Sequence, residues 1–293
     1  MGIYNQLKDK FIMKDAYKDW ENYRKALTDL ILNNSDMDLS FNKSRDLNET
    51  KSIAVIGAGR CNDIDLARLA EIFDEITLID IDAAALEECL SLQEENVKKK
   101  IKTEIISING LYENDMEAFC DELLNFVRKA GRELNEKLYE KFLDEMLEGL
   151  NKKIVAGLDM LQERFSNKSY DVVVCNGIYS QLLSMYSFFI RSVSQSVSDE
   201  LKLDVSGINK SIEIKLSKIN AMSVPAINKV LVDMAKKKIL FGNEFPEKSR
   251  VEGAAECIDD IRKNYMPDEI MLKWDFNLKE KIFYNMLIQI VKK

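Results

Sequence analysis

The stretch Ile53-Ala-Val-Ile-Gly57-Ala-Gly59-Arg-Cys-Asn62-Asp63 decides the fold, together with Ile76-Thr-Leu-Ile-Asp80-Ile-Asp82 downstream of it. An apolar strand runs into a glycine turn, a helix follows, and a second apolar strand ends in carboxylates. This is the first half of a nucleotide-binding βαβ unit, in which glycines let a ligand approach the backbone and the acid binds a ribose. We therefore predict an α/β, doubly wound, mostly parallel sheet.

Composition narrows the class of protein and its partners. The 293 residues are 46% hydrophobic and 31% charged with only 3 prolines, which is typical of a helix-rich globular chain. The net charge of -8 argues against a nucleic-acid partner, since such binding rests on many Lys and Arg contacts. No apolar run of about 18 residues is present, so no membrane association is predicted.

The cysteines and the absence of histidine limit the chemistry. The 5 cysteines form no CxxC pair, and we expect a cytoplasmic protein with reduced thiols. The chain has 0 histidines, which excludes Ser-His triads and His-ligated metals, and no metal site is predicted. Asp, Glu, Tyr and Lys are then the candidate proton shuttles.

The chain divides into an N-terminal helical cap with a linker, residues 1–50, and a Rossmann-like domain, residues 51–293. Tyr4, Phe11, Tyr17 and Trp20 are expected on one face of the cap. Asp63 is the predicted N-cap of the helix that follows the first strand. The second strand is expected at 75–80, its helix at 83–99 with Asp82 as N-cap, and the third strand at 103–108.

Later elements follow from periodicity. Leu138, Phe142, Met146 and Leu150 recur every four residues, which predicts two or three amphipathic helices inserted over about 113–166. The fourth strand is expected at 170–177 and the fifth at 238–242. Helices are predicted at 178–200 and 222–236, separated by an ambiguous stretch at 212–216. An antiparallel pair, 269–276 and 281–291, closes the sheet with Trp274 and Phe276 in its core.

The charge around the glycine loop indicates which ligand it prefers. A dinucleotide places its pyrophosphate at the helix N-terminus, where the dipole favours anions. Asp63 and Asp65 are predicted in the first helical turn, and each carboxylate would repel a pyrophosphate by roughly 1 kcal/mol or more. S-adenosylmethionine carries a sulfonium and an ammonium instead of phosphate. The loop therefore favours the cationic cofactor.

At these residues the chain resembles the class I S-adenosylmethionine-dependent methyltransferases. The resemblance implies a seven-stranded Rossmann-like sheet, Gly57-Ala58-Gly59 as the first motif and Asp80 as the ribose-binding acid. It also places residues 171–179 beside the transferred methyl, with Asn176 and Tyr179 as catalytic candidates. The implied cofactor-binding set is Gly57, Ala58, Gly59, Asp63, Asp80, Ile81, Asn109 and Asn176. The third glycine of the family's pattern is Cys61 here, and Asn176-Gly-Ile-Tyr179 lacks both prolines of the Asn-Pro-Pro-Tyr motif.

The resemblance implies in-line methyl transfer to a small-molecule or protein nucleophile, a reaction that needs alignment more than strong acids or bases. Three alternatives stay open at this point. They are a non-catalytic ligand-binding or scaffold protein on the same fold, an NAD-dependent oxidoreductase, and an aminopropyl transferase. The sequence also leaves open whether the chain forms a homo-oligomer.

Overall fold

The central sheet has the predicted doubly wound arrangement. A computed structural model describes residues 12–33, 50–246 and 251–293. Seven strands lie in the order β3-β2-β1-β4-β5-β7-β6. β7 is antiparallel to both of its neighbours and the other pairs are parallel, which confirms the mostly parallel seven-stranded sheet. The strands are β1 Ser52–Ile56, β2 Glu75–Asp80, β3 Ile101–Ile105, β4 Tyr170–Asn176, β5 Ala235–Glu244, β6 Asp268–Asn277 and β7 Ile282–Lys292.

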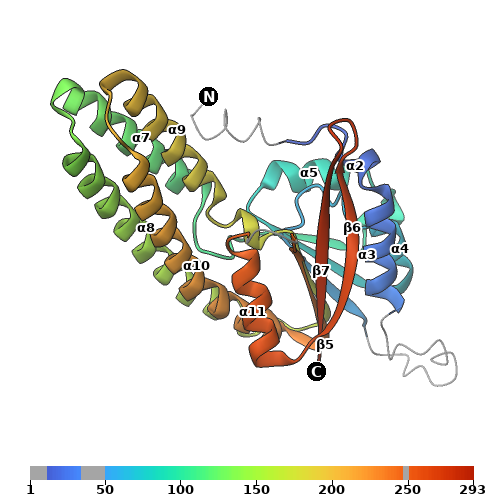
Figure 1. The fold of residues 1–293 in the computed structure, drawn as a ribbon. Helices are drawn as coiled ribbons and strands as arrows, with labels where there is room; N and C mark the ends of the chain where they lie inside the picture. Colours follow the sequence, from blue (N-terminus) through green and yellow to red (C-terminus); the bar gives the residue numbers. More distant parts are fainter. Residues whose placement is uncertain (1–11, 34–49, 247–250) are drawn as a thin grey trace, which may run out of the picture.

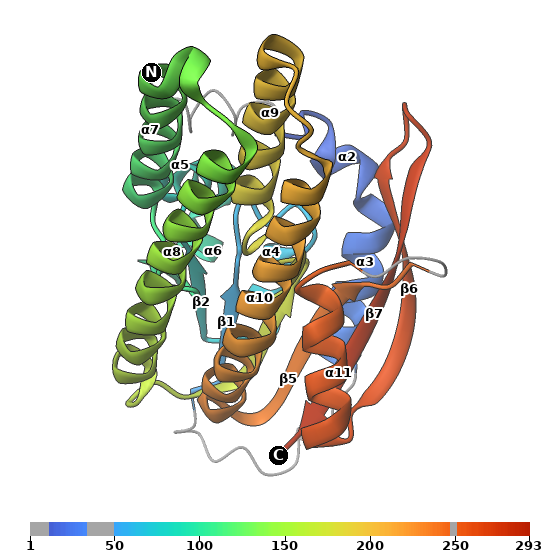
Figure 2. The same cartoon turned by 60° about the vertical axis from the view of Figure 1, so that its left-hand side comes forward.

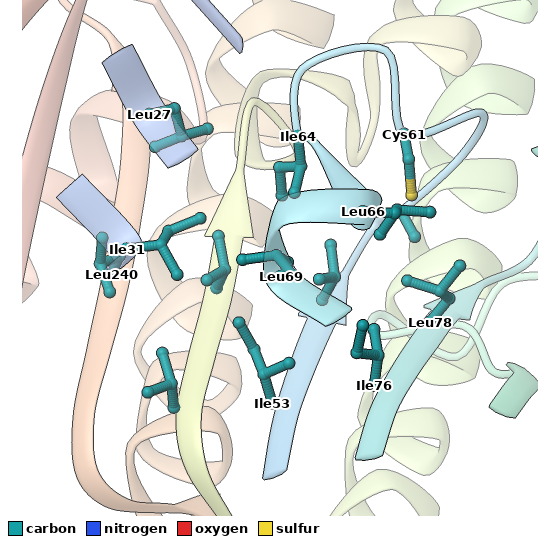
Figure 3. Close-up of a cluster of buried hydrophobic side chains, with 14 of the residues drawn as sticks. Leu27, Ile31, Ile53, Cys61, Ile64, Leu66, Leu69, Ile76, Leu78 and Leu240 are labelled. Carbon is teal, nitrogen blue, oxygen red and sulfur yellow. The ribbon is translucent and has the colours of Figure 1, made fainter. Parts of the chain in front are cut away.

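Helices cover both faces of this sheet because its central strands are apolar on both sides. In β1, Ile53 and Val55 belong to one buried cluster, whereas Ala54 and Ile56 belong to another on the opposite face. The first face carries two helices, α3, Glu21–Asn33, and α4, Leu66–Ile72. Leu66 and Leu69 of α4 pack onto β1 and β2 (Figure 3). The short helix α2, Ala16–Asp19, precedes α3. Tyr4 and Phe11 lie outside the described residues.

Four long helices form a second body beside the sheet (Figures 1 and 2). They are α7 Glu113–Ala130, α8 Glu136–Phe165, α9 Ser184–Leu201 and α10 Ser206–Met234. Their facing side chains make a hydrophobic cluster of their own, which includes Tyr139, Leu147 and Ile190. The later ends of α8 and α10 run back to the sheet, where Phe165 and Leu231 join the cluster on its second face. The predicted insertion therefore exists, but it packs together with α9 and α10.

Several predicted boundaries were wrong. The stretch 212–216 is not a break, because α10 is one continuous helix of 29 residues. Its buried residues Ile208, Ile212, Leu216 and Ile219 recur every three or four positions, which is helical spacing. Helix α11, Ala254–Tyr265, was not predicted at all.

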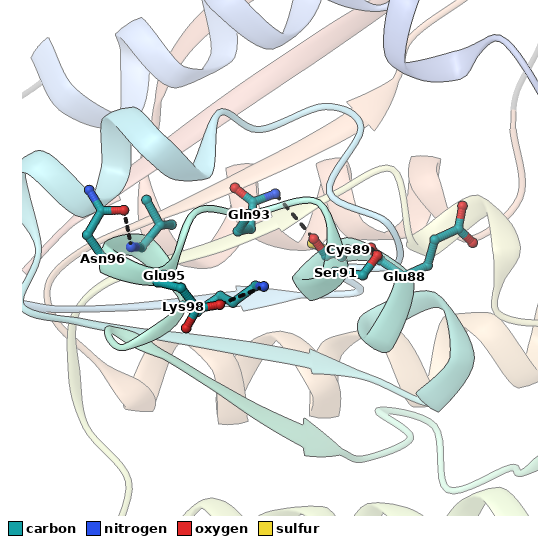
Figure 4. Close-up of polar contacts among 8 residues, drawn as sticks. Glu88, Cys89, Ser91, Gln93, Glu95, Asn96 and Lys98 are labelled. Carbon is teal, nitrogen blue, oxygen red and sulfur yellow. Dashed lines mark hydrogen bonds and ion pairs between the residues drawn. The ribbon is translucent and has the colours of Figure 1, made fainter.

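Helix 83–99 is broken into α5, Ala83–Ser91, and α6, Glu95–Lys98 (Figure 4). Near the break, the Gln93 side chain donates to the Cys89 carbonyl at 3.2 Å. The N-cap role of Asp82 is confirmed, because its carboxylate accepts from the Ala85 amide at 3.1 Å. None of the helices in the described ranges combines the length and the apolar composition that a membrane span requires.

Candidate functional site

A cavity of about 1080 Å³ opens at the carboxyl ends of the parallel strands. The loops after β1, β2, β3 and β4 line one part of it, and the end of β5 with the β6–β7 hairpin lines another. This is the crevice where β1 and β4 send the chain in opposite directions, the usual ligand position of an open α/β sheet. Helix α2 also reaches it, through Ala16. The fold thus gathers segments far apart in sequence around one space.

The glycine loop is held tightly to β2. The amides of Gly57 and Ala58 both donate to the Ile79 carbonyl, at 2.8 and 3.1 Å. Gly57 has a φ of +69°, and a Cβ there would lie 2.5 Å from Cδ1 of Ile178. The positive φ favours glycine, because other residues rarely adopt that conformation, and a side chain here would also have to displace that of Ile178.

Asp80 is fixed by the same loop. Its Oδ2 accepts from the Gly59 amide at 2.8 Å, and its Oδ1 accepts from the Asp82 amide at 2.8 Å. Burial raises the pKa of this carboxyl, although the two amide hydrogen bonds oppose the shift. A Cβ on Gly59 would meet only Asp80 Oδ2, at 4.0 Å, so this glycine faces open space within the cavity. The carboxylate is therefore held rigid beside an open ligand space.

Asp63 takes part in a partly buried chain of hydrogen-bonded side chains. Its Oδ2 accepts from Nδ2 of Asn176 at 2.6 Å, and Oδ1 of Asn176 accepts from the Tyr23 hydroxyl at 2.8 Å. Burial raises the pKa of Asp63. Asp63 and Asn176 both line the cavity. The chain thus connects the glycine loop to the end of β4 and to helix α3.

The predicted N-cap role of Asp63 was wrong. Helix α4 begins at Leu66, and Asp65 is its N-cap, accepting from the Arg68 amide at 3.1 Å. The bend Asn62-Asp63-Ile64 separates Asp63 from the helix and turns its carboxylate toward Asn176. Of the two acids in the charge argument, only Asp63 lines the cavity. The acidic character of the cavity comes from the carboxylates of Asp63, Asp80, Asp82 and Glu244.

Asn109 and Ile81 also line the cavity. Oδ1 of Asn109 accepts from Ser107 Oγ at 2.8 Å and from the Leu111 amide at 3.1 Å, while its Nδ2 donates to the Leu182 carbonyl at 3.0 Å. These contacts tie the loop after β3 to the loop after β4. Ile81 is 41% exposed and offers an apolar surface next to Asp80.

Tyr179 does not reach the cavity. Its ring is 1% exposed, and its hydroxyl donates to Oδ1 of Asn228 in helix α10. Burial raises the pKa of this phenol well above its usual range. The chain turns at Gly177, with φ +65°, and sends Tyr179 into the second face of the sheet. The sequence-based placement of Tyr179 beside the reacting group therefore disagrees with the structure.

Sequence reasoning missed one carboxylate at the cavity, Glu244. It ends β5 next to the end of β4, where Asn176 pairs with Gly242. A strand-end acid was the signal used for Asp80, and the same signal was present in Gly242-Asn-Glu244. Trp274 is in the sheet core as predicted, but Trp274 and Phe276 also line the cavity. Across the described ranges, no group of three or more His, Cys, Asp or Glu is placed to hold a metal ion.

No family model and no curated protein matches the sequence. Solved structures do match along most of the chain. Magnesium protoporphyrin IX methyltransferase (ChlM) from Synechocystis PCC 6803, with bound SAM, is 10% identical, with 96% of this chain and 86% of that chain covered at a TM-score of 0.44.

Two further solved structures resemble the chain at a similar level. A putative RNA methyltransferase, PH1948 from Pyrococcus horikoshii, is 11% identical over 94% of this chain and 89% of that one, with a TM-score of 0.42. WbdD is 12% identical over 98% of this chain and 47% of that one, with a TM-score of 0.47. Such identities carry no information about substrate, and the fold assignment rests on strand order and the direction of β7. The chain has the class I methyltransferase fold.

Proposed function

We propose that the chain binds S-adenosylmethionine in this cavity and transfers its methyl group to a nucleophile. The observation that carries the proposal is the Asp80 carboxylate, which the Gly59 amide holds at 2.8 Å beside the open face of that glycine. Each carboxylate oxygen accepts one backbone hydrogen bond and keeps a second lone pair. A ribose diol can donate to those remaining lone pairs.

The charge of the cavity supports this cofactor over a dinucleotide. Its described lining has carboxylates at Asp63, Asp80, Asp82 and Glu244. Arg60 is the one basic side chain in that lining, and it is ion-paired with Glu88 at 2.6 Å. A pyrophosphate would meet several carboxylates with little positive charge to offset them. A sulfonium and an ammonium would be attracted instead.

The remaining residues fit the parts of that cofactor. Asp63 is the candidate partner for its ammonium, because the carboxylate lies at the glycine loop and is held by Asn176. Ile81 and Asn109 are the candidate neighbours of the adenine, at the ends of β2 and in the loop after β3. When bound, the cofactor supplies a methyl group already activated by the sulfonium. The protein's task is then to align the acceptor with it and to exclude water.

Calorimetric titration with S-adenosylhomocysteine tests the proposal, using a Gly59→Ala variant. A methyl group at Gly59 points into the proposed ligand space, so we expect at least a tenfold loss of affinity in a folded protein. Gly131→Ala is the matched control, because Gly131 has nearly the same φ, +50° against +49° at Gly59, and a Cβ there meets nothing within 4 Å. Equal affinity of both variants for S-adenosylhomocysteine would reject the assigned site.

A further inference from the structure

The part of the cavity beyond the glycine loop has an aromatic wall, which we define as Trp20, Trp274, Phe276 and Tyr284. The ring centroids of Trp20 and Trp274 are 4.7 Å apart, and those of Phe276 and Tyr284 are 4.9 Å apart. Trp20 also donates from Nε1 to the Phe276 carbonyl at 2.9 Å, which holds the start of α3 against β6. All four residues line the cavity. Mutually packed rings of this kind form a preorganised apolar surface.

The pairing of strands places Glu244 on the same side of the sheet as this wall. Glu244 pairs with Met286 across β5 and β7, and Tyr284 pairs with Trp274 across β7 and β6. Paired residues share a face, as do residues two apart along a strand. Glu244, Tyr284 and Trp274 therefore project to one face, the face on which Tyr23 stacks over Trp274 at 5.0 Å.

Only one of the two carboxylate oxygens of Glu244 has a hydrogen-bond partner among the described residues. Its Oε1 accepts from Ser180 Oγ at 2.8 Å. Its Oε2 is buried and finds no hydrogen-bond partner among the described residues. Burial raises the pKa of Glu244. Burial also raises the pKa of Tyr23 and Tyr284, and the charge of Glu244 adds to both shifts. A buried carboxylate oxygen without a partner is costly, and a donor on a bound ligand would remove that cost.

The structure therefore points to a further inference, which rests on the proposed function: the methyl acceptor is an amine on an apolar body. We infer that its nitrogen donates to the Glu244 carboxylate while its body lies against the aromatic wall. Carboxylates recognise ammonium groups, and the faces of Trp and Tyr attract the same cations. An anionic acceptor would find no unpaired base in the described lining of the cavity.

The same arrangement supplies the proton acceptor that the reaction requires. An ammonium has no free lone pair, so it must lose one proton before it can attack. The proton passes to the Glu244 carboxylate, the nitrogen lone pair forms the new N–C bond, and the C–S bond breaks with its electrons going to sulfur. The products are a methylammonium and a neutral thioether. A carboxyl with a raised pKa is better matched to this transfer near neutral pH.

The test uses three small probes of one shape, each titrated into the full chain saturated with S-adenosylhomocysteine: phenethylamine, 2-phenylethanol and 3-phenylpropionate. We expect phenethylamine to bind at least tenfold more tightly than the other two. Glu244→Gln keeps the side-chain shape but removes the charge, so we expect it to abolish most of that preference. Glu280→Gln makes the same chemical change in the exposed β6–β7 turn and should leave the preference intact.

The outcomes separate the two proposals. If S-adenosylhomocysteine does not bind, the proposed function fails. If it binds but the carboxylate or the alcohol is preferred, or if Glu244→Gln retains the amine preference, the acceptor inference alone is overturned. A second readout is the pH profile of phenethylamine binding, which should lose its acid limb in Glu244→Gln. An unchanged profile in that variant would also contradict the role of Glu244.

Discussion

At the scale of single residues, Asp80 connects the fold to the proposed ligand. Its carboxylate closes the glycine loop through Gly59 and the next turn through Asp82. In Asp80→Asn the amide group faces one of these N–H donors, which leaves that donor unpaired at a cost of about 1–3 kcal/mol. We expect this loss in urea denaturation, together with at least a tenfold loss of affinity for S-adenosylhomocysteine. Full affinity in the variant would remove Asp80 from the ribose site.

Gly242 tests the chain of side chains around Asn176. A Cβ at Gly242 would lie 1.9 Å from Oδ1 of Asn176, so Gly242→Ala must displace the Asn176 side chain. The hydrogen bonds to Tyr23 and Asp63 are then lost in a partly buried region. We expect thermal or urea unfolding to show a loss of about 2–4 kcal/mol from overpacking and unpaired polar groups.

Gly207→Ala is the control for that substitution, because Gly207 lies in α10 and has open space around it. It should be neutral or slightly stabilising, since alanine is the better helix former. Equal stability of the Gly242→Ala and Gly207→Ala proteins would show that Asn176 is not held as described.

At the scale of elements, the two acids that precede helix α4, Asp63 and Asp65, have different roles. Asp65 caps the helix, so Asp65→Ala should lower the free energy of unfolding by about 1 kcal/mol and leave cofactor affinity unchanged. Asp63→Ala removes a cavity carboxylate and should weaken S-adenosylhomocysteine binding instead. Chemical denaturation and calorimetry on the pair measure both effects. The reverse pattern would restore Asp63 as the cap.

This pair also shows where sequence reasoning stops. The glycine turn, the strand-end Asp80 and the cap Asp82 are local signals. The ends of β2 and the start of α5 that they predict agree with the structure. Whether Asp63 or Asp65 caps α4 depends on the bend between them, which Asn176 and Arg24 hold from distant parts of the chain. The burial of Tyr179 depends likewise on Asn228, which lies 49 residues away.

At the scale of the molecule, periodicity indicated the helical insertion but not its size. The pattern over 113–166 predicted two or three amphipathic helices without showing what covers their apolar faces. α9 and α10 provide that cover, and α10 also reaches the sheet, through the cluster on its second face. Such long-range packing carries no signal at short sequence range. The central strands β1, β2 and β4 were predictable because each is a continuous and largely apolar run.

The acids of the cavity predict how stability changes with pH. Burial raises the pKa of Asp63, Asp80 and Glu244, so the folded protein binds their protons more tightly than the unfolded chain does. Their contribution is present below the usual carboxylate range and is lost as pH rises through the raised pKa values. Asp115, Asp171 and Glu269 have lowered pKa values, so their stabilising contribution is present above the usual carboxylate range and is lost only as pH falls below it.

We therefore expect the free energy of unfolding to fall as pH rises from about 5 toward 7, starting just above the usual Glu pKa. Urea denaturation at several pH values measures this, and Glu244→Gln should flatten the dependence. A stability that rises over that interval would contradict the burial of these carboxylates.

Cofactor binding tests the central claim most directly. The purified protein is titrated calorimetrically with S-adenosylhomocysteine, and with NADH in a parallel cell. The acidic cavity and the Asp80 geometry predict micromolar binding of S-adenosylhomocysteine and none of NADH. Binding of NADH alone, or of neither ligand, would contradict the account.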